Sequence, residues 1–236
     1  MKVIILAAGV GRRLNDTEDH LPKPLTELVN GKSILENQLD NLTPFISLRN
    51  VIIVVGYHKE VIINKFPSLF FIENPFFSVE NTSKSLFRAL NAIDEDVMWI
   101  NGDVVFRPSI IEKVLQVDCT SMVVNESPVG EEEVKYRANS EGRILEVSKT
   151  VSNADGEALG INFFKKKDLS LLKKHLDKCK ANDYFEKGIE GAIGDGLYVW
   201  KVPVAISDCV EIDFPEDLSK ANKILSLWSR DNKNEK

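Results

Sequence analysis

The sequence predicts an α/β protein built on a doubly wound, mainly parallel sheet. In the first half of the chain, short apolar runs typical of strands buried on both faces alternate with segments whose apolar residues recur at helical spacing. This alternation is typical of parallel strands joined by helices that cover both faces of one sheet. Ligands of such sheets bind at the carboxyl ends of the strands, so the residues that follow each strand are the first candidates for a site.

The elements of the first half are read from apolar runs and from helix signals. Strands are predicted at Val3–Leu6, Asn50–Gly56, Phe70–Glu73 and Val97–Asn101. Helices are predicted at Ser33–Leu42, Glu60–Asn64 and Ser85–Ile93. Ser33 and Glu36 have the spacing of a capping box, in which each side chain satisfies a free backbone amide of the other residue.

From Thr120 onward the pattern changes to short strand candidates separated by turn residues, which predicts hairpins in a small β-rich subregion. These strands are expected at Ser121–Asn125, Val134–Ala138, Arg143–Ser148 and Ala158–Phe164. Helices at Lys167–Cys179 and Tyr184–Ile193, short strands at Leu197–Trp200, Ala205–Ile206 and Val210–Ile212, and a last helix at Pro215–Trp228 follow. We expect one domain over residues 1–228, with halves at 1–118 and 119–228, and a polar tail at 229–236.

Composition limits the possible partners. The chain has 236 residues, 43% of them hydrophobic, and 30 basic against 36 acidic residues give a net charge of −6, which disfavours a nucleic-acid-binding surface. Cys119, Cys179 and Cys209 have neither disulfide nor zinc spacing, so a reducing cytoplasmic location is expected. The first apolar run is too short for a membrane span or a signal peptide, and no membrane insertion is expected. The sequence is compatible with a homodimer.

The segment after the first strand, Ala7-Ala8-Gly9-Val10-Gly11, has almost no side-chain bulk and therefore exposes backbone amides to an anion. Arg12 and Arg13 add two fixed positive charges directly after it. A P-loop would need a lysine and a hydroxyl residue after its last glycine, and the dinucleotide fingerprint would need a glycine where Leu14 stands. The segment is therefore a different polyanion-binding loop.

Leu6-Ala-Ala-Gly-x-Gly-x-Arg-Leu14, followed by Pro22-Lys23-Pro24-Leu25, resembles the signature of the nucleotidyltransferases that activate phosphorylated small molecules. The resemblance implies a Rossmann-like fold of the nucleotide-diphospho-sugar transferase type, a nucleoside triphosphate substrate and Mg²⁺. One departure is that sugar-phosphate members usually carry Pro-x-Thr after the arginine, where this chain has Asn15-Asp16-Thr17. This departure weakens a sugar-1-phosphate interpretation.

Asn81, Ser83 and Ser85, followed by Leu86, resemble the Asn-x-x-Ser-Leu of the cytidylyltransferases that activate phosphocholine, inositol phosphate or 2-aminoethylphosphonate. The stretch 211–218, Glu-x-Asp-x-x-x-Asp-Leu, resembles the same subgroup. The resemblance implies CTP as the preferred nucleotide and a small phosphorylated or phosphonate acceptor. Asn and Ser side chains at a helix start can read a pyrimidine or simply cap the helix, and both roles remain open.

Asp103 and Asp213 each follow an apolar run, and the resemblance implies that they bind the metal. The alternatives are a turn residue for Asp103 and a helix cap for Asp213. Lys23, held between two prolines, and Arg13 are the candidate catalytic cations, although Lys23 could also be a surface lysine in a proline turn. The candidate nucleotide-binding residues are Leu6, Ala7, Ala8, Gly9, Gly11, Arg12, Asn81, Ser83, Ser85, Asn101 and Gly102.

An acceptor that carries an ammonium group would need carboxylates and aromatic faces. The candidate acceptor-binding residues are Glu157, Tyr184, Glu190, Trp200 and Glu211, near a cluster that also contains Phe185, Glu186 and Tyr198. Aromatic residues at this spacing can equally belong to the core. His20, His58 and His175 have no metal-ligand or triad spacing, but a phosphate monoester, with a second pKa of about 6, needs no general base at neutral pH.

Two other functions remain open from the sequence. A sugar-1-phosphate uridylyl- or guanylyltransferase would differ in base and acceptor. A non-catalytic nucleotide-binding regulatory homologue would be expected to lack Lys23, Asp103 or Asp213, and this chain has all three.

Overall fold

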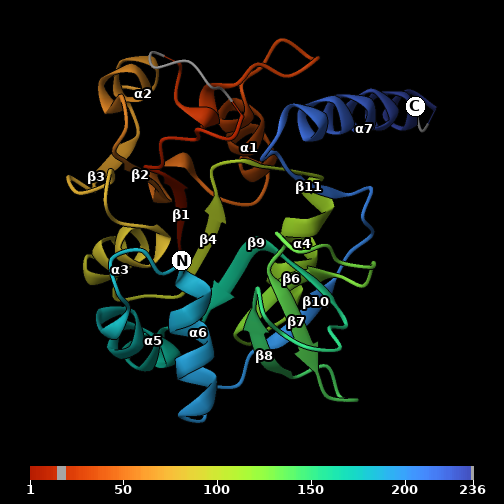
Figure 1. Ribbon diagram of the computed structural model, residues 1–236. Helices are drawn as coiled ribbons and strands as arrows, with labels where there is room; N and C mark the ends of the chain where they lie inside the picture. Colours follow the sequence, from red (N-terminus) through yellow and green to blue (C-terminus); the bar gives the residue numbers. More distant parts are fainter. Residues whose placement is uncertain (15–19, 235–236) are drawn as a thin grey trace.

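The computed structural model describes residues 1–14 and 20–234, so Asn15, Asp16 and Thr17 lie outside the described residues (Figure 1). The strands are β1 (Lys2–Ala7), β2 (Val51–Val55), β3 (Phe70–Glu73), β4 (Val97–Asn101), β5 (Val104–Phe106), β6 (Ser121–Asn125), β7 (Lys135–Ala138), β8 (Ile144–Ser148), β9 (Gly156–Phe164), β10 (Trp200–Pro203) and β11 (Cys209–Glu211). The helices are η1 (Lys23–Leu25), α1 (Ile34–Leu42), η2 (Leu48–Asn50), α2 (Lys59–Lys65), α3 (Thr82–Asn91), α4 (Pro108–Gln116), α5 (Lys166–Lys178), α6 (Phe185–Gly194) and α7 (Pro215–Asn234).

The predicted fold class is confirmed by one central sheet flanked by helices (Figure 1). Among the described residues this sheet has nine strands, and its main path runs β10-β6-β9-β4-β1-β2-β3. β1 pairs in parallel with both β2 and β4, and β3 continues the parallel half beyond β2. The chain moves outward from β1 to β3 and then returns to place β4 on the other side of β1. This reversal opens a crevice at the carboxyl ends of β1 and β4, where ligands of doubly wound sheets bind.

The second half of the sheet differs from the prediction in its pairing. β9 lies between β4 and β6 and is antiparallel to both, so β6 and β9 extend the central sheet instead of forming separate hairpins. The small β-rich subregion that remains is the hairpin of β7 and β8. In this hairpin β7 pairs with the first two residues of β9, Gly156 and Glu157. The strand expected at Ala205–Ile206 is wrong, because these residues lead into a turn closed by a hydrogen bond from Asp208 N to Ala205 O. α7 continues to Asn234, beyond its predicted end at Trp228.

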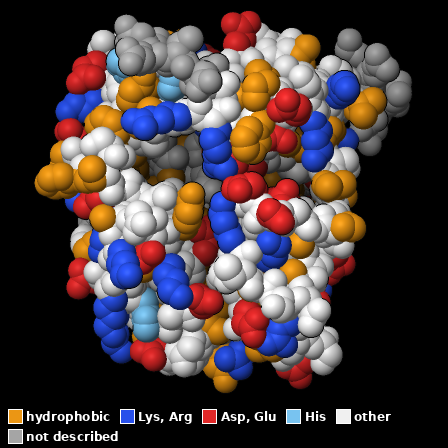
Figure 2. Space-filling view, viewed as in Figure 1, with side chains coloured by type: hydrophobic (Ala, Val, Ile, Leu, Met, Phe, Trp, Pro, Cys, Tyr) orange, Lys and Arg blue, Asp and Glu red, His pale blue; other side chains and the backbone are white. Residues whose placement is uncertain are grey.

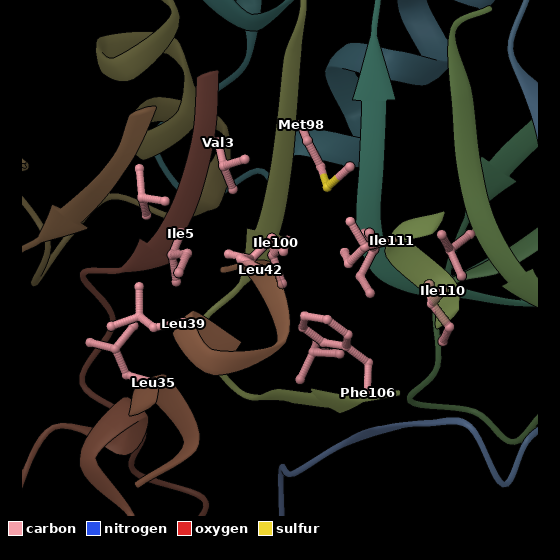
Figure 3. Packing of buried hydrophobic residues seen from close by; sticks show 14 of the residues in the cluster. Val3, Ile5, Leu35, Leu39, Leu42, Met98, Ile100, Phe106, Ile110 and Ile111 are labelled. Atoms are coloured by element: carbon pink, nitrogen blue, oxygen red, sulfur yellow. The ribbon is translucent and has the colours of Figure 1, made fainter. Parts of the chain in front are cut away.

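Two apolar layers hold the helices against the faces of the sheet. Successive residues of β1 point to opposite faces, so Ile5 packs with Leu35, Leu39 and Leu42 of α1, as Figure 3 shows, while Ile4 packs on the other side. On that second face Trp99 of β4 is fully buried among α3, α5 and α6. None of the described helices is long and apolar enough to cross a lipid bilayer.

Candidate active site

A cavity of about 510 Å³ lies at the carboxyl ends of β1 and β4, at the reversal of strand order. On the face drawn in Figure 2, acidic and basic side chains stand side by side around the centre. The predicted site residues that line this cavity are Leu6, Ala7, Gly9, Gly11, Arg12, Arg13, Lys23, Asn81, Asn101, Gly102, Asp103, Glu157, Tyr184, Glu211 and Asp213. The fold therefore brings residues from both ends of the chain to one site.

The glycine-rich loop after β1 packs directly on Lys23. Gly11 has a φ of +71°, which favours glycine, and a Cβ at this position would lie 2.9 Å from the Cβ of Lys23. Lys23 begins the short helix η1 between Pro22 and Pro24, and it is only 8% exposed. The alternative that Lys23 is a surface lysine is therefore wrong.

The Lys23 ammonium bridges the two aspartates that were predicted to bind the metal. Its Nζ lies 2.7 Å from Asp103 Oδ2 and 2.6 Å from Asp213 Oδ1. Burial lowers the pKa of Lys23, but the charges and hydrogen bonds of Asp103 and Asp213 together outweigh it, and the net pKa is above its usual value. Arg13 Nη2 approaches the same Asp213 Oδ1 at 3.0 Å. Lys23 and Arg13 therefore both contact Asp213, and Lys23 also contacts Asp103.

A short antiparallel ladder brings Asp103 and Asp213 together. Glu211 of β11 pairs with Val104 of β5, and Ile212 N donates to Asp103 O at 3.0 Å. Asp217 caps the start of α7, because its Oδ2 accepts from the backbone amides of Asp213 at 3.1 Å and of Phe214 at 2.9 Å. The side chain of Asp213 is therefore free of the capping role considered from the sequence, and it points to Lys23.

The turn that carries Asp103 is held from below by a buried glutamine that the sequence did not single out. Gln38 of α1 donates from Nε2 to Asn101 O and to Val104 O, both at 2.8 Å. These two carbonyls flank the Gly102-Asp103 turn, so the hydrogen bonds fix the direction in which Asp103 leaves the sheet. In the sequence, the only indication of this role is that Gln38 is a polar residue on the apolar face of the predicted helix.

The donor set around Asp103 fits a divalent cation. Asp103 Oδ1 is buried and has no hydrogen-bond partner among the described residues, while its Oδ2 already faces an ammonium that Asp213 shares. Mg²⁺ is commonly held by one or two carboxylates together with substrate phosphates. No group of three or more His, Cys, Asp or Glu side chains suited to a metal occurs in the described part of the chain.

The side chain of Glu211 occupies a space that exists because residue 160 is a glycine. Its Oε1 accepts from Asn101 Nδ2 at 3.1 Å, and a Cβ on Gly160, whose φ is +64°, would lie 2.5 Å from that oxygen. Burial raises the pKa of Glu211 well above its ordinary value, and the Asp103 charge adds to this effect. Gly160 is a second residue that the sequence did not reveal as part of the site.

The stretch from Asn81 to Ser85 forms the start of α3 and one wall of the site. Asn81 accepts from Thr82 N at 2.8 Å, so its side chain caps the helix, but it also lines the main cavity and a smaller one beside it. Ala8 and Ser85 line this smaller cavity. Ser83 is buried and is not among the residues that line either cavity.

The structure separates the predicted acceptor residues into two sets. Glu157 and Tyr184 line the main cavity. Glu190 is paired with Lys187 at 2.7 Å, and neither it nor Trp200 is among the lining residues of the cavities described here. Of the two predicted aromatic residues, Tyr184 therefore lines the cavity and Trp200 does not.

Lys149 and Glu132 are among the charged residues of the cavity that were not predicted from the sequence. Lys149 follows the strand β8 directly, and its Nζ lies 5.3 Å from the centre of the Tyr184 ring and 3.3 Å from Glu132 Oε2. Arg13 Nη1 lies 3.7 Å from the same oxygen of Glu132. Lys149 follows a strand of an antiparallel hairpin, to which the rule for the ends of parallel strands does not apply, so the sequence offered no local signal for it.

The family comparison matches the first two thirds of the chain. The sequence profile of the MobA-like NTP transferase domain matches residues 3–157. The CMP-5'-(3-aminopropyl)phosphonate synthase of Streptomyces rubellomurinus is 26% identical over 94% of this chain. The bifunctional protein GlmU of Methanocaldococcus jannaschii is 27% identical over 95% of this chain. The chain spans 38% and 54% of the lengths of these two proteins.

Solved structures with the same fold match almost end to end. The inositol-1-phosphate CTP transferase of T. maritima superposes with a TM-score of 0.78 at 22% identity, covering 95% of this chain and 94% of that one. The CTP:phosphocholine cytidylyltransferase LicC of Streptococcus pneumoniae gives a TM-score of 0.73 at 22% identity, covering 95% and 98%. At this identity these structures establish the fold alone.

Proposed function

Because this chain belongs to the MobA-like NTP transferase family, we propose that it is a cytidylyltransferase that joins CTP to a small acceptor bearing a phosphate or phosphonate. In this reaction an acceptor oxygen attacks the α-phosphorus of CTP, the bond to the β-phosphate breaks, and pyrophosphate leaves. The observation that carries the proposal is the Lys23 ammonium held between Asp103 and Asp213 at the glycine-rich loop. The attacking acceptor oxygen and the phosphate group that it attacks are both negatively charged. Catalysis therefore depends mainly on neutralising these charges and on positioning the two substrates.

The loop, the cations and the two aspartates have separate roles in this reaction. Backbone amides of the Gly9–Gly11 loop and the charges of Arg12 and Arg13 hold the triphosphate. Lys23 neutralises the phosphates as they exchange. Asp103 and Asp213 would hold Mg²⁺, which neutralises phosphate charge and orients the phosphate oxygens when it is bound. The acceptor phosphate is already ionised near neutral pH and supplies its own nucleophile, because its second pKa is about 6.

The choice of CTP is supported by the named activity of the phosphonate synthase relative, which aligns with 94% of this chain. The competing choice, a sugar-1-phosphate uridylyltransferase, is supported by the UTP--glucose-1-phosphate uridylyltransferase AglF of Haloferax volcanii, which is 33% identical over 47% of this chain. The Asn81–Ser85 wall favours the first choice, since sugar-type members often have glycine where these side chains narrow the site.

The base preference is the first prediction. Glu80 lines the smaller cavity, and its carboxylate, which pairs with Arg88 at 2.7 Å, keeps further lone pairs that suit the 4-amino group of cytosine, whereas the amide oxygen of Asn81 already accepts from Thr82 N. We expect CTP to be used at least about tenfold better than UTP, with ATP and GTP poor substrates, because a wrong base leaves buried polar groups unmatched. Pyrophosphate release from each nucleotide should be measured with 2-aminoethylphosphonate, phosphocholine, inositol 1-phosphate and glucose 1-phosphate. Productive use of UTP or GTP with glucose 1-phosphate alone would favour the sugar-type function.

The second prediction concerns Lys23 and the metal. Lys23→Ala removes the ammonium that neutralises both carboxylates, so Mn²⁺, used as a probe without nucleotide, should bind about tenfold more tightly. The same variant should lose turnover with CTP, because the phosphates lose their cation. Titration calorimetry measures the affinity, and Lys59→Ala, which removes a surface lysine paired with Glu73, is the control. Unchanged Mn²⁺ affinity in Lys23→Ala would place the cation elsewhere.

A further inference from the structure

The main cavity contains a buried carboxylate that has no ion-pair partner among the described residues. Glu186 lies in the first turn of α6, is only 7% exposed and lines the cavity. Its Oε2 is buried and has no hydrogen-bond partner, and no ion pair to Glu186 exists among the described residues. A buried carboxylate in this state is costly, because its charge has no ion-pair partner and one of its two oxygens has no hydrogen bond.

The surroundings of Glu186 tie it to the reaction site. The segment before α6 packs on the start of α3, since Asn81 N donates to Ala181 O at 2.7 Å and Phe185 N donates to Thr82 Oγ1 at 3.1 Å. Asn81 and Thr82 line the nucleotide end of the same cavity. A ligand that reaches Glu186 therefore lies beside the nucleotide wall.

A second carboxylate, which is partly buried, lines the same cavity. Glu157 of β9 accepts from Asn125 Nδ2 at 2.8 Å but has no ion-pair partner within the described ranges. Lys149, which also lines this cavity, is already 3.3 Å from Glu132, and its Nζ lies 5.3 Å from the centre of the Tyr184 ring. Glu132 Oε2 also lies 3.7 Å from Arg13 Nη1, so one carboxylate pairs with both Lys149 and Arg13. A bound phosphate or phosphonate could replace this carboxylate as the partner of both cations.

The charges thus form two poles in one cavity. Lys149 and Arg13 suit the anionic group of an acceptor, and Glu186 suits a positive group on the same molecule. A hydroxyl would satisfy the free oxygen of Glu186 but leave its charge unbalanced. A quaternary ammonium would balance the charge but has no N–H to donate, whereas a primary ammonium does both.

We propose that Glu186 is a specificity-determining residue that binds the primary ammonium of an aminoalkyl phosphonate or phosphate acceptor. This inference rests on the proposed function for its reaction and narrows the acceptor to one chemical class. It separates primary amines from phosphocholine, which lacks the N–H donor, and from inositol phosphate, which lacks the charge. Tyr184, whose ring already lies beside the Lys149 ammonium, provides an aromatic face at the edge of this pocket.

The test compares acceptors with different tails, of which 2-aminoethylphosphonate and ethylphosphonate differ only in the amino group. With CTP as donor, kcat/KM is measured for 2-aminoethylphosphonate, ethylphosphonate, phosphocholine and inositol 1-phosphate. We expect the primary amine to exceed each of the others by about tenfold or more. Glu186→Gln keeps the size and the hydrogen-bonding carbonyl but removes the charge, so it should lower kcat/KM for the primary amine by about 10- to 100-fold and leave ethylphosphonate within about twofold.

Glu190→Gln is the matched control, because it makes the same change one turn later on α6, at a residue paired with Lys187 outside the cavity lining. Calorimetric binding of 2-aminoethylphosphonate and ethylphosphonate to both variants tests the inference independently of turnover. Equal binding of the two ligands, or unchanged discrimination in Glu186→Gln, would overturn it. Selective binding of the amine without pyrophosphate release from any nucleotide would instead count against the proposed reaction and leave the ammonium site standing.

Discussion

Replacing Asp103 with alanine is expected to lower kcat by about 10²- to 10³-fold, the loss typical of removing one preorganised electrostatic group from an active site. Asp103 Oδ2 is 2.7 Å from Lys23 Nζ, and its Oδ1 is buried and free for a cation. The variant therefore loses a proposed metal ligand and one of the two partners that position Lys23. Asp213→Ala should have the same effect, because its Oδ1 contacts both Lys23 and Arg13.

The melting temperature distinguishes a site effect from an unfolding effect. Neither aspartate packs in the apolar core, and Lys23 keeps one carboxylate in each single variant, so the melting temperature should change by only a few degrees. Asp40→Ala, which removes an exposed carboxylate paired with Lys32, is the control for loss of charge. A variant that keeps more than about a tenth of the wild-type rate, a barrier change below about 1.4 kcal/mol, would show that the aspartate is not a metal ligand.

Elements whose signals are local could be predicted from the sequence. The capping box at Ser33 and Glu36 is present as expected, and α1 begins at Ile34. The strands β3 and β6 have the predicted bounds, because each is a short apolar run closed by polar residues. The glycine-rich loop could also be placed, since its lack of side chains is itself the signal.

The pairing of distant strands could not be predicted in the same way. β9 resembles its hairpin neighbours in sequence, but it inserts between β4 and β6 because its long apolar run is buried on both faces of the central sheet. β5 is only three residues long, too short for a periodic signal, yet its ladder with β11 joins Asp103 to Asp213. Their proximity was inferred from the family resemblance, since nothing in local spacing indicates it.

The acceptor end was the least predictable part of the site. Tyr184, Glu186 and Glu190 lie within seven residues on one segment, but only the first two line the cavity. Their separation depends on how the first turn of α6 rests on α3, which is a tertiary contact. Lys149 comes from a different hairpin, and only the fold shows that its ammonium lies beside Tyr184.

The pH dependence of stability provides the last prediction. Burial raises the pKa of Glu186 from 4.5 to about 7, although its own backbone amide and the Lys149 charge act in the opposite direction. The folded protein therefore binds more protons than the unfolded chain between these two pH values. The free energy of unfolding should consequently fall as pH rises through this window, by about 3 kcal/mol from this residue alone. Below about pH 4.5 the carboxyl is protonated in both states and the penalty is absent.

Glu186→Gln isolates this contribution, because glutamine fills the same space without titrating. The difference in unfolding free energy between Glu186→Gln and the wild type should grow with pH from about 4.5 and level off above about 7, with the variant becoming the more stable protein. Urea denaturation at a series of pH values measures this difference. Glu190→Gln removes a carboxylate that is paired with Lys187 on the same helix, so its curve should run parallel to that of the wild type across the window. A constant difference for Glu186→Gln would mean that the carboxylate is compensated in the folded protein, and the free charge that an ammonium would neutralise would then not exist.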